Sequence, residues 1–207
     1  MNCKWIVGCG DYLEQVVQAW RQACPEKSVQ RIEVSQRSDH SFDLSVLDGL
    51  NAADGDMFVA FDERFGNFKR MELMQAAMAR RFKLEALVHP SAVVGAGAVI
   101  GMNVYVGPQV VIGHGTRIDY NTVIHAGVQI GAGVKIKSSC WVESGVQLSS
   151  AVELGAHCTI RTGVLIRPQV KVGRGCELGW PRAYESDVPS KTVFDCRYDQ
   201  PIHVYGH

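Results

Sequence analysis

The chain has 207 residues, of which 46% are hydrophobic, as in a globular protein of one large domain or two small ones. Lys and Arg together number 21, as do Asp and Glu, so no bulk charge attracts nucleic acid or an anionic membrane. The N-terminus lacks an apolar export segment, and no stretch approaches the roughly 18 apolar residues of a membrane span, so we expect a cytoplasmic protein.

The pattern of residues 1–87 predicts a small α/β domain. The apolar run KWIVGCG predicts a strand, and the helical spacing of YLEQVVQAWRQA predicts a helix after it. VQRIEVS and DMFVAF predict two more strands, FKRMELMQAAMARR an amphipathic helix, and LEALV a final strand. This order favours a mostly parallel sheet that is shorter than a full dinucleotide-binding domain.

From Val88 onward the sequence repeats every six residues. Fifteen hexapeptides in phase begin with Val, Ile or Leu, and their fifth position is small or β-branched throughout. A period of six predicts a parallel β-helix in which three hexapeptides form one triangular coil. Residues 88–179 therefore predict about five coils, stacked about 4.8 Å apart, with aliphatic residues pointing inward and glycine at the corners.

Three of the seven cysteines lie 18 residues apart at the inward fifth position: Cys140, Cys158 and Cys176. A metal site is one interpretation, but a buried ladder of small side chains explains the spacing better, so no metal is predicted. The chain has no CxxC spacing, and reduced thiols are expected. The non-repeating tail, residues 180–207, is expected to cap the last coil or to cross to a neighbouring chain.

The repeat, the junction phrase VHPSAVV and the opening IVGCGDYLEQVV resemble the left-handed β-helix, or hexapeptide-repeat, acyltransferases. The order of parts is similar to that of bacterial sugar acyltransferases of the sialic-acid O-acetyltransferase type, which include N-acetyltransferases acting on nucleotide-linked amino sugars. The resemblance implies a homotrimer that binds acetyl-CoA along the coils between two subunits. It also implies that the Rossmann-like domain, residues 1–87, holds the nucleotide-sugar acceptor, and that a corner histidine is the general base.

His125 is the first candidate for this base. In the stacked register His125 lies one coil from Glu143 and two coils from Arg161, so the carboxylate could orient the imidazole and raise its basicity. The family's base occupies the third position of its hexapeptide, where this chain has Ala126. His114, at a third position on another corner, is an alternative base, and a solvated corner of paired charges is the non-catalytic alternative.

Binding residues are expected at both ends of the chain. Basic corners of the late coils, in particular Arg161, Arg167 and Arg174, suit the phosphates of coenzyme A, or are ordinary surface charge. Gly8 and Gly10 would let backbone amides approach the acceptor. Tyr12 stands where the family motif GxGGH has its histidine, and is expected beside the acceptor.

Two hypotheses on function follow. The first is an acetyl-CoA-dependent acyltransferase acting on an amine or hydroxyl of a sugar. The second is a catalytically eroded β-helix that serves as a structural, assembly or ligand-binding module. The shifted histidine and the altered glycine motif favour the second hypothesis, whereas the repeat and the order of the domains favour the first.

Overall fold

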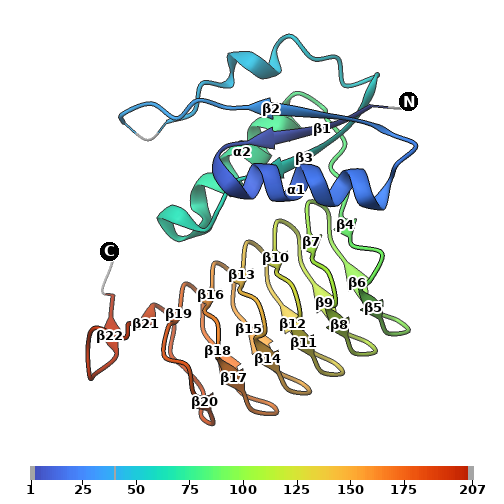
Figure 1. Cartoon of the computed structure of the whole chain (residues 1–207). Coiled ribbons are helices and arrows are strands. Elements are labelled where there is room, and N and C mark those ends of the chain that lie inside the picture. Colours follow the sequence, from blue (N-terminus) through green and yellow to red (C-terminus); the bar gives the residue numbers. More distant parts are fainter. Residues whose placement is uncertain (1–2, 40, 205–207) are drawn as a thin grey trace.

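The computed structural model describes residues 3–39 and 41–204 and contains two units, one above the other (Figure 1). An α/β unit lies at the N-terminus, and a triangular solenoid of short parallel strands runs beneath it. The predicted fold, an α/β domain followed by a left-handed parallel β-helix, is confirmed.

The α/β unit is built on a three-stranded parallel sheet with helices on both faces. Its strands, in the spatial order β2-β1-β3, are β1 (Cys3–Gly8), β2 (Ser28–Glu33) and β3 (Gly55–Ala60). The helices are α1 (Gly10–Ala23) and α2 (Phe68–Ala79), with two short 3-10 helices, η1 (Leu44–Leu47) and η2 (Arg64–Asn67). α1 packs against Ile6 and Phe58, and α2 packs against the opposite face through Leu73 and Met74. The three strands and two helices expected before residue 82 are therefore present.

The last strand expected in this domain, residues 84–88, is not part of its sheet. Leu84 forms only an isolated bridge with Met57, and Leu87–Val88 is already the first strand of the solenoid, β4. The apolar run LEALV is shared between the two units because Leu87 packs beneath α1 while Val88 begins the inward ladder.

The solenoid is a prism whose three sides are parallel sheets, here called sheets C, D and E. Sheet C contains β4, β7 (Tyr105–Val106), β10 (Val123–Ile124), β13 (Trp141–Val142), β16 (Thr159–Ile160), β19 (Glu177–Leu178), β21 (Thr192–Phe194) and the antiparallel β22 (Ile202–His203). Sheet D contains β5 (Val93–Val94), β8 (Val111–Ile112), β11 (Gln129–Ile130), β14 (Gln147–Leu148), β17 (Leu165–Ile166) and β20 (Ala183–Tyr184). Sheet E contains β6 (Val99–Ile100), β9 (Arg117–Ile118), β12 (Lys135–Ile136), β15 (Glu153–Leu154) and β18 (Lys171–Val172).

Neighbouring coils pair in a register of 18 residues, as the hexapeptide period predicts. Ile124, for example, lies between Val106 and Val142. The first and fifth positions of the hexapeptides form one continuous apolar core that includes the fully buried Cys140 and Cys158. Each of these two thiols donates to a carbonyl oxygen 3.1 Å away in the next coil. Packing and hydrogen bonding therefore account for the cysteine ladder.

Glycine is frequent at two corner positions for two different reasons. At the fourth position the backbone is left-handed, as at Gly127 (φ +68°), where glycine has the least strain. At the second position glycine lets the neighbouring coil come close: a Cβ on Gly113 would lie 2.5 Å from the backbone nitrogen of Ala132. At the corner between sheets C and D, the CD corner, a Cβ on Gly107 would lie 3.0 Å from the nearest atom. Other second positions carry side chains, among them His125 and Arg161 on the CD corner.

The C-terminal residues close the end of the prism. Tyr184, on β20, continues the inward ladder past residue 179, so the prism has about six turns rather than the expected five. After it the chain leaves the six-residue register, and Phe194 on β21 packs edge-on against Tyr184 and Trp180. These aromatic rings cover the last coil.

Sheet C is the side of the prism that carries the α/β unit. Its outward positions Tyr105, Val123 and Trp141 are buried under α1. The corner residue Asn103 pairs with the backbone of Val59 on β3, accepting from its N–H at 2.7 Å and donating to its carbonyl at 3.2 Å. The two units therefore share one apolar core, and the side chain of Asn103 joins them by two hydrogen bonds to the backbone of β3.

Arg70 of α2 is a second connection between the units, and its side chain is fully buried. The guanidinium donates to the carbonyls of Asn121 and Cys140 on the coils, at 3.1 and 3.3 Å. It also donates to the carbonyls of residues 61–62 and, at 2.9 Å, to the side chain of Asn67. Burial lowers the pKa of Arg70 to about 10, so the group stays charged at neutral pH and needs all of these acceptors.

Candidate active site

A pocket of about 480 Å³ opens where the two units meet at the CD corner. Three segments converge there: the start of α1, the β3–α2 loop (residues 61–67) and the third and fourth coils, which supply His125 and Trp141. The lining residues are Gly10, Asp11, Tyr12, Gln15, Asp62, Arg64, His125 and Trp141. The pocket therefore combines an imidazole, two aromatic rings and two carboxylates beside one guanidinium.

His125 lies in this pocket within a cage of aromatic rings. Its ring centroid is 4.5 Å from that of Trp141 and 6.0 Å from that of Tyr12, with Tyr105 at 6.3 Å. Its Nε2 atom is buried and has no hydrogen-bond partner within the described residues. Such an atom can still bind a polar group of a ligand or a water molecule.

Burial lowers the pKa of His125 to about 4, even though the carboxylates of Glu143 and Glu63 act in the opposite direction. The imidazole is therefore neutral at pH 7 and has a free lone pair. A neutral imidazole can accept a proton, as a general base must, but a pKa of about 4 makes it a weaker base than an imidazole whose pKa lies near the operating pH.

Glu143 lies one coil from His125, as the register predicts, but its oxygens are engaged elsewhere. Oε1 accepts from Arg161 at 2.7 Å, and Oε2 accepts from the backbone N–H of Thr162 at 2.8 Å. Burial raises the pKa of Glu143, but these hydrogen bonds outweigh that effect and hold the pKa below its ordinary value. In the part of the chain that the structure describes, no hydrogen bond joins Glu143 to His125. Its action on the imidazole is electrostatic.

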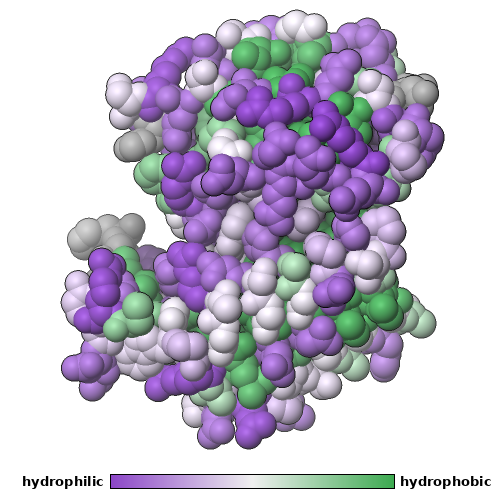
Figure 2. Space-filling view, in the orientation of Figure 1, coloured by the Kyte–Doolittle hydropathy of each residue, from purple (hydrophilic) through white to green (hydrophobic). Residues whose placement is uncertain are grey.

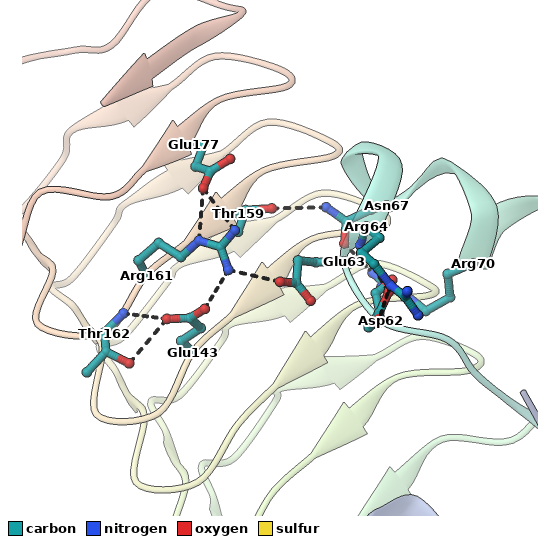
Figure 3. Close-up of polar contacts among 10 residues, drawn as sticks. All are labelled: Asp62, Glu63, Arg64, Asn67, Arg70, Glu143, Thr159, Arg161, Thr162 and Glu177. Atoms are coloured by element: carbon teal, nitrogen blue, oxygen red, sulfur yellow. Dashed lines mark hydrogen bonds and ion pairs between the residues drawn. The ribbon is translucent and has the colours of Figure 1, made fainter. Parts of the chain in front are cut away.

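Arg161 is held by three carboxylates (Figure 3). Its guanidinium contacts Glu63 at 2.9 Å, Glu143 at 2.7 Å and Glu177 at 2.9 Å. These hydrogen bonds raise the pKa of Arg161 against the effect of burial. A guanidinium with three acidic partners has little capacity left for a phosphate, so its surroundings do not fit the coenzyme-binding role expected from the sequence.

The three N-terminal candidates are placed differently from one another. Gly10 (φ +70°) and Tyr12 line the pocket with His125. The hydroxyl of Tyr12 is buried without a partner, and burial raises its pKa well above the ordinary value. Gly8 lies behind the pocket, where a Cβ would come within 1.6 Å of the carbonyl oxygen of Ala60. Glycine at position 8 is therefore required by the close approach of β1 and β3.

The other two arginine candidates lie far from His125, on the corners at either edge of sheet E. Arg167 precedes β18 and has one partner, the exposed Glu185 at 3.6 Å, and the exposed Arg174 follows the same strand. Beside Arg174 a groove of about 460 Å³ runs along the outer face of sheet E. It is lined by side chains that include Lys135, Lys137, Lys171, Glu153 and Asp187.

The remaining histidines described are separated from the pocket. His114 is exposed on the corner between sheets D and E. His157 is buried and stacks on Phe68 with ring centroids 4.2 Å apart. His89 shares hydrogen bonds with Ser91 and Gln22 near the junction of the two units. Only His125 therefore combines burial with a place in the lining of this pocket.

Five pocket residues were not among the sequence candidates, namely Asp11, Gln15, Asp62, Arg64 and Trp141. A signal for Trp141 was present: Tyr105, Val123 and Trp141 form a column of apolar outward residues at 18-residue spacing. The matching column on sheet E is charged, with Arg117, Lys135, Glu153 and Lys171. The apolar column indicates that something covers this side of the prism. Asp62 and Arg64 lie in an irregular loop and had no such signal.

In the ranges 3–39 and 41–204 there is no group of three or more His, Cys, Asp or Glu residues arranged to hold a metal ion. No helix among the described residues has both the length and the apolar character needed to cross a membrane.

The architecture defines the class of fold: hexapeptide-repeat left-handed β-helices with an N-terminal α/β unit. A family model described as the GMPPB C-terminal domain matches residues 82–140, the junction and the first coils. A search of curated proteins finds no match.

Solved structures match almost the whole chain. The acetyltransferase domain of PglB from Neisseria gonorrhoeae is 22% identical, with a TM-score of 0.84, and the match covers 98% of this chain and 100% of that one. PerB from Caulobacter crescentus, in complex with CoA and GDP-perosamine, is 23% identical with a TM-score of 0.80, covering 93% of each chain. WeeI from Acinetobacter baumannii is 13% identical with a TM-score of 0.65, covering 97% of this chain and 100% of that one. This chain therefore shares the fold of these proteins over both units.

Proposed function

We propose that this protein is an acetyl-CoA-dependent acetyltransferase that acts on an amine or hydroxyl of a nucleotide-linked sugar, with His125 as general base. The observation that carries the proposal is the pocket at the CD corner, in which the start of α1 and the β3–α2 loop meet a neutral, unpartnered imidazole. Similar solved structures are described as acetyltransferases bound to acetyl coenzyme A, or to CoA and GDP-perosamine, which supports the same class of reaction.

The chemistry requires one proton acceptor at the attacking atom. The lone pair of the acceptor nitrogen or oxygen attacks the thioester carbonyl carbon while His125 removes the proton from that atom. The C–S bond of the tetrahedral intermediate then breaks, and the leaving thiolate of coenzyme A takes the proton back from the imidazolium. The nearby Glu143 and Glu63 stabilise the imidazolium electrostatically, which offsets part of the effect of burial.

The acceptor is held by the α/β unit. Gly10 leaves the pocket open at the start of α1, since no atom lies within 4 Å of the position that an added Cβ would take. The unpartnered hydroxyl of Tyr12 is available to a polar group of the sugar. Arg64, whose side chain is 54% exposed and steadied by Asp62 at 2.7 Å, suits the diphosphate, because a guanidinium can donate two parallel hydrogen bonds to phosphate.

The donor binds in the groove along sheet E, where Lys135 and Lys171 can pair with the phosphates of coenzyme A, with the exposed Arg174 next to the groove in sequence. Sheet E is the side of the prism opposite the CD corner, so the groove and His125 of one chain lie on different sides of the prism. In the proposed assembly a second copy supplies the groove. A homotrimer provides such an arrangement, and the first coils expose apolar side chains that suit its contact surface, among them Val93, Val99 and Val111. Figure 2 shows apolar surface on the side of the solenoid where the first coils lie.

A second candidate is a β-helix scaffold without catalysis. One observation favours it: both oxygens of Glu143 are occupied by Arg161 and Thr162, so the imidazole lacks the orienting hydrogen bond that many catalytic histidines have. A scaffold has no requirement to bind the donor, so acetyl-CoA binding separates the two candidates.

Calorimetric titration with acetyl-CoA, followed by a free-thiol assay with UDP- and GDP-linked amino sugars, tests the proposal. We expect saturable binding that is weakened at least about tenfold by Lys171→Met, because a desolvated phosphate contact is lost. Lys69→Met is the matched control, since Lys69 pairs with Glu72 on α2, away from the groove. Absence of binding at millimolar acetyl-CoA would favour the scaffold.

A further inference from the structure

The β3–α2 loop, which carries two residues of the pocket, has an unfavourable backbone conformation. Three consecutive residues, Phe65, Gly66 and Asn67, have φ of 56°, 61° and 66°. Residues with a side chain rarely adopt the left-handed region, and a run of three depends on contacts from outside the loop. The position of the loop is therefore set by whatever it is attached to.

The C-terminal end of the loop is attached to one coil and to α2. Asn67 donates from Nδ2 to Oγ1 of Thr159 on β16 at 3.2 Å and accepts from Arg70 at 2.9 Å. Both Asn67 and Arg70 are fully buried. This end of the loop is held at the centre of the interface between the two units.

The N-terminal end of the loop is attached to the same coil. Oε1 of Glu63 accepts from Arg161, two residues beyond Thr159, at 2.9 Å (Figure 3). Asp62 and Arg64 flank Glu63, and both line the pocket that contains His125. The loop segment that carries Asp62 and Arg64 is therefore held to one coil at both ends, through Arg161 and Thr159.

Arg161 is itself fixed in position. Its Nε donates to Glu177 at 2.9 Å, and its Nη1 donates to Glu143 at 2.7 Å, so acidic side chains of the coils before and after it hold the guanidinium. Its side chain is 31% exposed, and its planar group reaches carboxylates from three separate segments. Three carboxylates around one cation also repel a phosphate, which excludes the coenzyme as its main partner.

From these contacts we infer that Arg161 is a positioning residue: by holding Glu63 against the coil it sets the β3–α2 loop, and with it Asp62 and Arg64, at the acceptor pocket. The effect of this arrangement on acceptor binding rests on the proposed function. The effect on the loop does not, because the contacts of Glu63 and Asn67 hold the backbone whatever the pocket binds.

Hydrogen exchange of the loop tests the inference directly. In Arg161→Met we expect the loop amides, in particular those of Arg64 and Asn67, to exchange about tenfold faster or more, as for loss of a half-buried ion pair. The amide of Asn67 is protected by the carbonyl of Glu63 at 3.0 Å, so it reports on the attachment. Arg167→Met is the matched control, because Arg167 has the same hexapeptide position and only an exposed partner.

Two further variants allow the inference to be tested even if Arg161→Met lowers the overall stability of the protein. Glu63→Gln removes the ion pair while leaving the cluster of Arg161, Glu143 and Glu177 in place, and we expect the same local increase in exchange. Arg161→Lys keeps the charge and should restore part of the protection. Unchanged exchange of the loop in both Arg161→Met and Glu63→Gln would overturn the inference.

Ligand affinities separate this role from a donor-binding role. With GDP-perosamine as the probe, Arg161→Met should raise the acceptor KM about tenfold, while the Kd for acetyl-CoA stays within about twofold of the wild-type value. A loss of acetyl-CoA affinity with an unchanged loop would contradict the inference and assign Arg161 to the coenzyme. If the wild-type protein neither binds acetyl-CoA nor transfers acetyl groups, the proposed function fails, and the exchange data alone decide the positioning role.

Discussion

His125 and Trp141 lie on successive coils of the CD corner with ring centroids 4.5 Å apart and an interplanar angle of 61°. The contact arises because position 141 is the outward residue of β13 and is covered by α1, so its indole is buried between the α/β unit and the coils, beside the imidazole. The same contact that buries the histidine also forms the floor of the pocket. Trp141 therefore couples the stability of the fold to the proton affinity of His125.

The first prediction concerns the proton affinity of His125. Since burial lowers its pKa from the ordinary value of 6.5 to about 4, its imidazole should stay neutral between pH 5.5 and 8. In NMR titrations its Cε1–H resonance should not shift over this range. A midpoint near 6.5 for His125 would contradict the burial argument.

The lowered pKa of His125 also makes the free energy of unfolding depend on pH. Above about pH 6.5 both folded and unfolded states carry a neutral His125, so the group contributes no pH dependence. As the pH falls from about 6.5 to 4 the unfolded state takes up the proton first, and the free energy of unfolding decreases by up to roughly 3 kcal/mol. Urea unfolding at several pH values should show this decrease in the wild-type protein and a smaller one in His125→Asn.

A second prediction concerns Trp141, whose side chain is only 7% exposed. Trp141→Ala should lower the free energy of unfolding by about 3–5 kcal/mol, because it leaves a cavity between α1 and the coils. The same change should raise the pKa of His125 toward 6.5, since water would enter the cage. Trp141→Phe, which keeps most of the apolar area, should have a smaller effect on both. If Trp141→Ala and Trp141→Phe changed the stability and the pKa of His125 equally, the aromatic rings around His125 would not be the cause of its low pKa.

A third prediction concerns the buried guanidinium of Arg70. Arg70→Met should cost at least about 3 kcal/mol of stability, because it leaves several buried carbonyl oxygens without a donor. Arg80→Met is a suitable control on the end of the same helix, as Arg80 pairs with the exposed Asp48. We expect that control to change stability by no more than about 0.5 kcal/mol in denaturant titrations.

A fourth prediction separates two glycines that the sequence alone treats alike. Gly8→Ala should prevent normal folding, because its Cβ would lie 1.6 Å from the carbonyl oxygen of Ala60. Gly10→Ala has open space and only the strain of a left-handed φ of +70°, so it should fold with a loss of about 1 kcal/mol. Soluble yield and thermal unfolding of the two variants measure the difference. Similar stabilities would contradict this division of roles.

Much of the fold could be predicted from the sequence, because the pattern that encodes it is local and repeated. The six-residue period fixes the coil, the 18-residue register and the inward ladder, including Cys140 and Cys158. The 18-residue register also predicts that His125, Glu143 and Arg161, at the second position of their hexapeptides, stack in one column. The prediction that Glu143 orients His125 rested on the spacing of the coils alone, and the register gives the spacing of the backbones but not the direction of the side chains.

The rest of the pocket depends on how two units pack. Glu63 meets Arg161 across 98 positions of sequence, and Asn67 meets Thr159 across 92. No local pattern encodes such pairs. The clearest missed signal was the apolar outward column on sheet C, which shows the covered side of the prism and so the place of Trp141. The packing role of Gly8 was not predicted for the same reason, since a close approach between β1 and β3 cannot be told from a ligand contact in sequence.

The most direct test of the proposed function compares acetyl transfer by the wild-type protein and by His125→Asn. Transfer is measured as thiol release from acetyl-CoA and as acetylated product by mass spectrometry. With UDP- and GDP-linked amino sugars as acceptors, we expect turnover by the wild-type protein. We expect His125→Asn to lower kcat by at least about 10²-fold with the Kd for acetyl-CoA unchanged, as for loss of a general base. Full turnover by His125→Asn would contradict the central claim.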